Sequence, residues 1–278
     1  MKSYYGNVIL VTGASSGIGK AISEHLAQLG FRVYGTSRST DNGRIVLSGE
    51  NPSMGFLRLV RLDVCDHSSV EKAVEYVMDA EGRIDVLINN AGFGISGAIE
   101  ETSAEEALSQ FNTNFFGMHR MCRRVLPVMR NQGKGLIINT GSVAGLFAIP
   151  YQAMYSASKY AIEAYTEALR MEVKEFGIRA VVIEPGDTCT GFTDHRYFCK
   201  ESRESLYKKS KGSIEKMMKD EQNGAGPGQI AKIVERLLAK SNPPVRVTVG
   251  PMYKTFVFLK RLLPARLVER LLHGMYCR

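Results

Sequence analysis

Residues Val8 to Gly19 read VILVTGASSGIG, and this stretch sets the architecture of the chain. Its first four residues form a continuous apolar run, which is typical of a β-strand that is covered on both faces. Gly13 and Gly17 follow, and an apolar pattern with helical spacing then continues to Gly30. In a unit of strand, glycine turn and helix, the backbone can approach a pyrophosphate, and the helix N-terminus offers free amide donors. The stretch therefore predicts a dinucleotide site, although a plain strand-to-helix turn has the same local pattern.

Segments of the same character recur along the chain. Further apolar runs predict strands at residues 31–36, 56–62, 84–88, 134–142, 179–184 and 245–249. Helical spacing between them predicts helices at residues 66–80, 102–130, 153–176 and 229–240. Residues 40–55 are rich in Gly, Asn and Ser, and we expect a loop there. This alternation predicts an α/β Rossmann fold, which is a doubly wound parallel sheet with helices on both faces.

Polar residues follow several of these strands, at the sheet edge where the carboxyl ends of the strands line a ligand crevice. The second strand ends at Arg38, and no acidic residue stands there. An acid would bind the ribose 2′-hydroxyl of NAD, whereas an arginine accommodates the 2′-phosphate of NADP, so Arg38 predicts NADP(H). Asp63 and Val64 follow the third strand, and the Asp63 carboxylate could accept a hydrogen bond from the adenine amino group. The fourth strand runs into Asn90, Ala91 and Gly92.

Catalytic chemistry is expected between Ser142 and Lys159. Tyr155 and Lys159 are four residues apart in a predicted helix, so both side chains project from one face. The lysine ammonium is expected to lower the pKa of the tyrosine, which would suit proton transfer at neutral pH. Ser142 ends the fifth strand and could hold a substrate oxygen against the phenol. A chain with 12 tyrosines can also contain this spacing by chance.

Composition narrows the class of protein. The chain has 278 residues and is 44% hydrophobic, enough for the core of a single domain over residues 1–278. No run resembles a signal-peptide core or approaches the ~20 apolar residues of a membrane span. Five scattered cysteines without a Cys-x-x-Cys pair indicate neither a disulfide framework nor a metal site, so we expect a cytoplasmic protein. Most of the net charge of +8 lies in residues 244–278, which argues against a nucleic-acid partner.

The ordered motifs together resemble the short-chain dehydrogenase/reductase family. They are Thr12-Gly-Ala-Ser-Ser-Gly-Ile-Gly19, Asn89-Asn-Ala-Gly92, Asn114, Ser142, Tyr155-x-x-x-Lys159 and Pro185-Gly186. The resemblance extends over residues 5–250 and implies seven parallel strands and a catalytic tetrad of Asn114, Ser142, Tyr155 and Lys159. It also implies NADP(H) contacts at Gly13, Ser15, Ser16, Gly17, Ile18, Gly19, Arg38, Asp63, Val64, Asn90, Ala91, Gly92, Tyr155, Lys159, Pro185, Gly186, Thr188 and Thr190. Thr188 stands where the family often has Val, and a backbone contact would survive that change.

The resemblance implies a mechanism as well. Ser142 and Tyr155 would hydrogen-bond a substrate carbonyl, and Tyr155 would act as the acid or base. Lys159 would stabilise the phenolate and bind the nicotinamide ribose. Asn114, which is a poor helix former inside a predicted helix, would hold a water that completes the proton path; a solvated side chain or a helix kink are the alternatives.

Residues 191–226 form a long insertion that family members use as a lid. Its apolar residues, with Phe147 near the catalytic serine, favour a bulky lipophilic ketone or alcohol, and we expect substrate contacts at Ser142, Tyr155, Phe147 and Phe192. Lid and C-terminal extension together resemble the 17β-hydroxysteroid and retinol dehydrogenase branch, so a hydroxysteroid is expected. A 3-oxoacyl carrier-protein reductase, with Arg130 and Arg170 meeting an acidic carrier, is an alternative. So is a non-catalytic protein that senses NADPH.

The tail at residues 252–278 alternates leucines with basic residues in a helical pattern that continues from Tyr253 to Tyr276. Such a helix can pack on the domain, or its basic amphipathic character can bring it to an anionic membrane surface. The family resemblance implies a homodimer or homotetramer, with dimers formed through the helices that contain Asn114 and Tyr155.

Overall fold

The computed structural model describes residues 3–48, 55–194, 196–200 and 205–277. Its centre is an eight-stranded sheet with the order β10-β8-β7-β5-β1-β2-β4-β3. The strands are β1 (Val8–Val11), β2 (Arg32–Ser37), β3 (Arg44–Ser48), β4 (Phe56–Arg61), β5 (Val86–Asn89), β7 (Gly135–Thr140), β8 (Ile178–Glu184) and β10 (Arg246–Thr248). Within this sheet, as far as the described residues extend, seven strands pair in parallel, and β3 alone is antiparallel to its neighbour β4. The predicted parallel sheet is confirmed, with one added edge strand.

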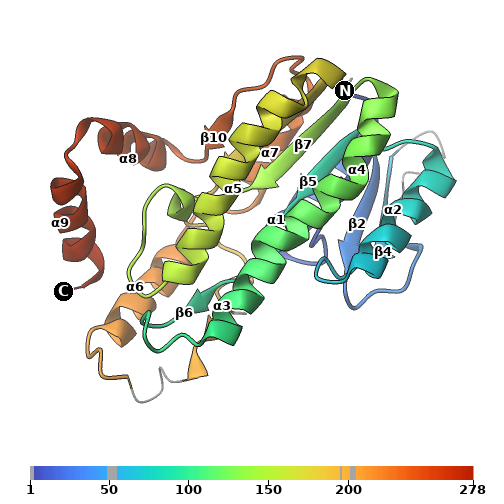
Figure 1. The fold of residues 1–278 in the computed structure, drawn as a ribbon. Coiled ribbons are helices and arrows are strands. Elements are labelled where there is room, and N and C mark those ends of the chain that lie inside the picture. Colours follow the sequence, from blue (N-terminus) through green and yellow to red (C-terminus); the bar gives the residue numbers. More distant parts are fainter. Residues whose placement is uncertain (1–2, 49–54, 195, 201–204, 278) are drawn as a thin grey trace.

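Helices cover both faces of the sheet, as the predicted fold requires (Figure 1). They are α1 (Gly17–Gln28), α2 (His67–Glu81), α3 (Ala104–Phe111), α4 (Met118–Gln132), α5 (Ala153–Glu172), α6 (Ser210–Gln222) and α7 (Gly228–Leu238). Neighbouring residues of β1 enter different cores: Ile9 packs in the core shared with α1 and α7, whereas Leu10 packs in the core shared with α2, α4 and α5. The apolar run of β1 is continuous because both of its faces are buried.

The loop predicted for residues 40–55 is wrong in part, because Arg44–Ser48 form β3. This strand pairs with β4 at the outer edge of the sheet. Ile45 and Val46 remain 54% and 45% exposed, so the strand has no buried run that would distinguish it from a loop. Residues 49–54 of the predicted loop lie outside the described residues.

The predicted helix at residues 102–130 divides into three elements. Ser103 caps α3 through a reciprocal pair of hydrogen bonds with Glu106, a capping box. A π-helical turn, Asn112–Gly117, then connects α3 to α4. Turns of this kind are rare and occur frequently at functional sites, and this one contains Asn114.

The tail forms two helices in place of the single helix predicted. They are α8 (Pro251–Leu262) and α9 (Ala265–Tyr276). Leu263 between them is extended, with φ −86° and ψ 141°, because the proline ring of Pro264 disfavours the helical region for the preceding residue. Figure 1 shows both helices on one side of the molecule, far from α2 and the β2–β4 edge of the sheet. Across the described residues, no helix is both long enough and apolar enough to span a membrane.

Candidate active site

Three of the predicted catalytic side chains come from the end of β7 and from α5. Ser142 follows β7 and begins a short 3-10 turn, Val143–Gly145, whose Ala144 amide donates to the Ser142 hydroxyl at 3.1 Å. A hydrogen bond also links the hydroxyls of Ser142 and Tyr155. Lys159, one turn after Tyr155 on α5, places its Nζ 5.6 Å from the centre of the Tyr155 ring. The serine, the phenol and the lysine therefore meet at the carboxyl edge of the sheet.

The expected low pKa of Tyr155 is wrong for the protein alone. Burial raises the pKa of Tyr155 to about 12, and the Ser142 hydrogen bond offsets this only in part. Lys159 is buried too, and it donates to the Thr140 carbonyl oxygen at 2.8 Å. Burial lowers the pKa of the Lys159 ammonium to about 8, so the side chain remains mostly charged at neutral pH but loses its proton more easily than an exposed lysine. Tyr155 therefore keeps its proton at neutral pH, as a proton donor must.

Asn114 lies in the π-turn, and its side chain is fully engaged with the chain. Its Oδ1 accepts from the Phe93 amide at 3.0 Å, while Nδ2 donates to the Phe93 carbonyl at 3.0 Å and to the Ser158 hydroxyl at 3.2 Å. Ser158 in turn donates to the Tyr155 carbonyl oxygen at 2.7 Å. The side chain of Asn114 thus fixes the loop after β5 against α5, whereas the sequence predicted a role in holding water. Ser158 was missed because a serine inside a helix has no distinctive pattern.

The glycine-rich turn has the shape that a pyrophosphate requires. Gly13 and Gly17 adopt the left-handed region, with φ of 68° and 54°. A methyl group on Gly19 would lie 2.2 Å from the Gly13 carbonyl oxygen, so the turn closes without room for a side chain. Ser16 precedes α1 without a side-chain cap, and the first amides of the helix remain open to an anion. These residues fit a dinucleotide.

Asn90 and Thr12 join this turn to the loop after β5. The Thr12 hydroxyl accepts from the amides of Asn90 and Ala91 at 2.9 and 3.0 Å. The Asn90 side chain donates to the carbonyl oxygens of Thr12 and Gly13, both at 3.1 Å. The Nδ2 group of Asn90 therefore holds the glycine turn against the loop after β5.

The remaining predicted cofactor residues lie along the same edge. Arg38 is exposed at the end of β2, and it makes no hydrogen bond or ion pair with another described residue. Asp63 accepts from the Cys65 amide at 2.9 Å, and Val64 is buried beside it. The structure thus brings together, around the carboxyl ends of the strands, Gly13, Ser15, Ser16, Gly17, Ile18, Gly19, Arg38, Asp63, Val64, Asn90, Ala91, Gly92, Pro185, Gly186, Thr188 and Thr190.

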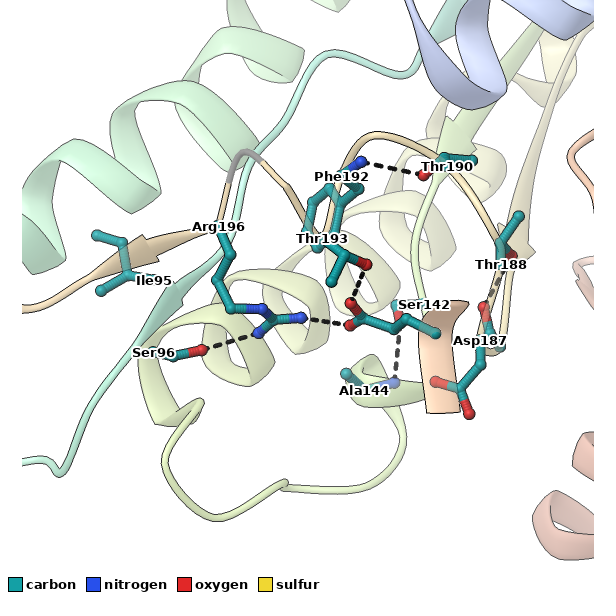
Figure 2. Close-up of polar contacts among 12 residues, drawn as sticks. Ile95, Ser96, Ser142, Ala144, Asp187, Thr188, Thr190, Phe192, Thr193 and Arg196 are labelled. Atoms are coloured by element: carbon teal, nitrogen blue, oxygen red, sulfur yellow. Dashed lines mark hydrogen bonds and ion pairs between the residues drawn. The ribbon is translucent and has the colours of Figure 1, made fainter. Parts of the chain in front are cut away.

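The segment after β8 carries Phe192, Thr193 and Arg196, whose surroundings Figure 2 shows. The Phe192 ring lies 5.8 Å from the Tyr155 ring, centre to centre, so this predicted substrate residue does border the phenol. Buried Arg196 donates to the Ser96 hydroxyl at 2.8 Å and pairs with Glu221 on α6, which also accepts from Thr193 at 2.6 Å. The sequence did not reveal this ion pair, because the charges of the lid nearly cancel and no spacing links residues 25 apart.

A cavity of about 740 Å³ lies beside the site, under α8 and α9. Its walls are mostly apolar, and they include Val143, Phe147 and the loop at Gly186 and Thr188. The opposite wall consists of tail residues, namely Pro251, Met252, Tyr253, Phe256, Leu259, Lys260, Leu263, Val268, Leu271, Leu272, Met275 and Tyr276. The predicted contact residue Phe147 therefore lines a space that the tail covers, which agrees with the alternative in which the tail packs on the domain.

Two buried glutamates and one half-exposed glutamate surround Arg246 behind Ser142. Glu163 on α5 and Glu184 on β8 each have a carboxylate oxygen 3.3 Å from Nε of Arg246, and Glu167 pairs with the same guanidinium. A methyl group on Gly141, next to Ser142, would lie 2.8 Å from the Glu163 carboxylate. Burial, with the neighbouring Glu184 charge, raises the pKa of Glu163 to about 8.

This raised pKa predicts that stability falls as the pH increases. The folded protein binds a proton on Glu163 more tightly than the unfolded chain does, so the stabilisation is complete below the ordinary carboxyl pKa of 4.5 and lost as the pH rises through about 8. We expect the free energy of unfolding from urea titrations to decrease by about 2–4 kcal/mol across that range. Glu163→Gln keeps the shape of the protonated carboxyl and should reduce the dependence of the unfolding free energy on pH. Equal pH dependence in the two proteins would contradict the assignment of this effect to Glu163.

Comparisons with known proteins agree with this arrangement. A family model described as short chain dehydrogenase matches residues 7–197. The chain is 42% identical to a 3-ketodihydrosphingosine reductase of Bacteroides thetaiotaomicron, covering 97% of each protein. It is 28% identical to retinol dehydrogenase 8 of Bos taurus, over 92% of this chain and 86% of that protein.

Solved structures point the same way. A short-chain dehydrogenase from Streptomyces avermitilis superposes with a TM-score of 0.80 and 33% identity, covering 92% of this chain and 94% of that one. A short-chain dehydrogenase/reductase from Burkholderia phymatum, solved in complex with NAD, gives 0.78 and 25%, covering 94% and 95%. With a matched family model, a full-length relative and the assembled site, the chain belongs to the short-chain dehydrogenase family and is an NAD(P)-dependent oxidoreductase.

Proposed function

We propose that the protein uses NADPH to reduce a ketone on a bulky lipid to the secondary alcohol. The observation that carries this proposal is the apolar cavity of about 740 Å³, whose wall at Val143 adjoins the catalytic Ser142. A volume of this size suits a lipid-sized ligand, and apolar walls favour chains and rings over sugars. The name of the Bacteroides relative, a reductase of a long-chain keto lipid, supports the same class of substrate.

Each residue of the site would have a separate chemical role in such a reduction. Ser142 and Tyr155 would both donate hydrogen bonds to the substrate carbonyl oxygen, which stabilises the negative charge that develops there. Tyr155 then transfers its proton to that oxygen, and Lys159 stabilises the resulting phenolate. A bound NADPH would supply the hydride. The residues that would hold it are the glycine turn with the first amides of α1, Arg38, Asp63, the loop at Asn90, Lys159 and the segment from Pro185 to Thr190.

An acyclic keto lipid is favoured over the hydroxysteroid expected from the sequence. The relative with 42% identity over the full length is named for a long-chain substrate, whereas the retinol dehydrogenase is 28% identical. The carrier-protein alternative is weakened by Arg170, whose guanidinium donates to the carbonyl oxygens of Ala180 and Pro243, both at 2.7 Å. Arg170 therefore has little capacity left to meet an acidic carrier.

A panel of carbonyl substrates tests the proposal. NADPH consumption would be measured with 3-ketodihydrosphingosine, a 17-ketosteroid, retinal and a 3-oxoacyl thioester, each at matched detergent concentration. We expect the highest kcat/KM with the long-chain keto lipid. Preference for the steroid would restore the expectation from the sequence. Consumption with none of the four would favour the alternative of a protein that senses NADPH without turnover.

The proposed preference for NADPH rests on Arg38. Its guanidinium is exposed and has no acidic partner among the described residues, so it can pair with the 2′-phosphate. We expect Arg38→Leu to raise the KM for NADPH about 10-fold, equivalent to about 1.4 kcal/mol, and to leave the KM for NADH unchanged. Arg123→Leu, which removes an exposed charge from α4, is the matched control. A parallel loss with both cofactors would exclude recognition of the phosphate.

A further inference from the structure

Helices α8 and α9, residues 251–276, form a C-terminal arm with little anchorage. None of the residues in either helix is buried. The arm is attached mainly by polar contacts: Tyr253 donates to the Asp187 carboxylate, and Lys260 donates to the Leu146 carbonyl oxygen. Near its end, Lys216 of α6 lies 5.6 Å from the ring centre of Tyr276. Helices of this composition are usually held by an apolar face in a core, so the arm has apolar surface that the chain itself does not cover.

The arm has two faces. The inner face lines the cavity beside the active site. The outer face lies away from the cavity and carries three large apolar side chains, Phe258, Leu262 and Leu267, which are 60%, 65% and 38% exposed. A single exposed leucine is common on a protein surface. Three large apolar side chains on two consecutive helices without a buried residue are typical of a contact surface.

The same outer face is strongly basic. Lys254, Arg266 and Arg270 are exposed on it, and none of them pairs with a carboxylate in the described part of the chain. Glu269 is the single acid in residues 251–276. Basic side chains interspersed with aromatic and aliphatic ones are the composition of helices that lie in the interface of an anionic membrane.

We infer that the outer face of the arm docks on an anionic lipid surface. Phe258, Leu262 and Leu267 would enter the boundary between headgroups and acyl chains, and the three basic side chains would reach the phosphates. A second copy of this chain is disfavoured as the occupant, because two such faces would bring like charges together with one acid each to compensate. Lipid phosphates, in contrast, complement every one of these charges.

Docking in this orientation would leave only the arm between the cavity and the lipid, because the inner face of the arm forms one wall of the cavity. A lipid ketone would then have a short path from the membrane to the site. This route for the substrate rests on the proposed function, whereas the docking itself does not. The two are therefore tested by separate measurements.

Co-sedimentation with vesicles tests the docking. The full chain would be mixed with vesicles of phosphatidylcholine alone or with a quarter of phosphatidylglycerol, at 0.05 and 0.5 M salt. We expect binding to the anionic vesicles that is about 10- to 100-fold tighter than to the neutral ones and that weakens at the higher salt concentration. Lys254→Gln/Arg266→Gln/Arg270→Gln should remove this preference, and Phe258→Ser/Leu262→Ser should weaken binding to both kinds of vesicle.

The matched control removes three exposed charges elsewhere, in Lys72→Gln/Arg123→Gln/Lys174→Gln, and should bind like the original chain. Reduction of a short water-soluble ketone without lipid should be unchanged in all three variants, because none of these residues lines the cavity or the catalytic site. Equal binding to neutral and anionic vesicles, or loss of binding in the control as well, would overturn the inference. A change of molecular mass on light scattering in the arm variants, with no vesicle binding by the original chain, would assign the face to self-association.

Discussion

Tyr155→Phe is expected to lower kcat for ketone reduction by about 10²- to 10⁴-fold, the range that a lost general acid accounts for. The substitution removes the hydroxyl that hydrogen-bonds Ser142 and leaves the ring against Phe192 in place. The KM for NADPH should change little, because the phenyl ring keeps the shape of the site. Steady-state kinetics with the best substrate of the panel measure both quantities.

Tyr160→Phe is the matched control. It removes a phenolic hydroxyl from the same helix, where Tyr160 is 39% exposed and its hydroxyl donates to the Leu146 carbonyl oxygen. We expect kcat within about 2-fold of the original, because the partners of the Tyr160 hydroxyl among the described residues are the Leu146 carbonyl oxygen and Lys260, and not Ser142 or Tyr155. Equal losses in the two variants would mean that the phenol of Tyr155 is not the acid.

Gly19→Ala is expected to weaken NADPH binding by about 100-fold and to lower the free energy of unfolding by about 1–3 kcal/mol. The new methyl group would lie 2.2 Å from the Gly13 carbonyl oxygen and 2.5 Å from Nδ2 of Asn90, so the turn must open. Opening it breaks the hydrogen bonds from Asn90 to Thr12 and Gly13 that join the two loops. Fluorescence titration with NADPH and urea unfolding measure the two effects.

Gly212→Ala provides the comparison. Gly212 is the third residue of α6, as Gly19 is the third residue of α1, and a methyl group there meets nothing within 4 Å. Alanine in that position should stabilise the protein by about 0.5–1 kcal/mol and leave NADPH binding unchanged. If Gly19→Ala behaved like Gly212→Ala, the tight turn would not be the cofactor site.

The sheet was predictable from the sequence because its strands are buried on both faces. Val8–Val11 and Ile178–Glu184 have no polar alternation, and only a parallel sheet between two helical layers accommodates such runs. The edge strand β3 was not predictable, since its residues are half exposed. Pro264 marks the break between α8 and α9. The leucines continue at helical spacing on both sides of this proline, and their pattern led to the prediction of a single helix.

The candidate site was predictable as a set of positions, but its electrostatics were not. The spacing of Tyr155 and Lys159 places both on one face of a helix, which the structure shows. The depth at which each side chain lies is a property of the packed protein, and that burial reverses the expected direction of the Tyr155 pKa. The ion pair of Arg196 with Glu221 and the glutamates around Arg246 depend on contacts between distant segments, which no local pattern encodes.

The proposed reaction transfers a hydride from NADPH to a carbonyl carbon held at the Ser142–Tyr155 site. It is tested by mass spectrometry of the alcohol formed from a lipid ketone and NADPH that carries deuterium at both C4 positions. We expect the carbinol carbon of the product to gain one deuterium with the original chain, and almost no labelled alcohol to form with Tyr155→Phe. An alcohol without deuterium, or equal labelled product from both proteins, would contradict it.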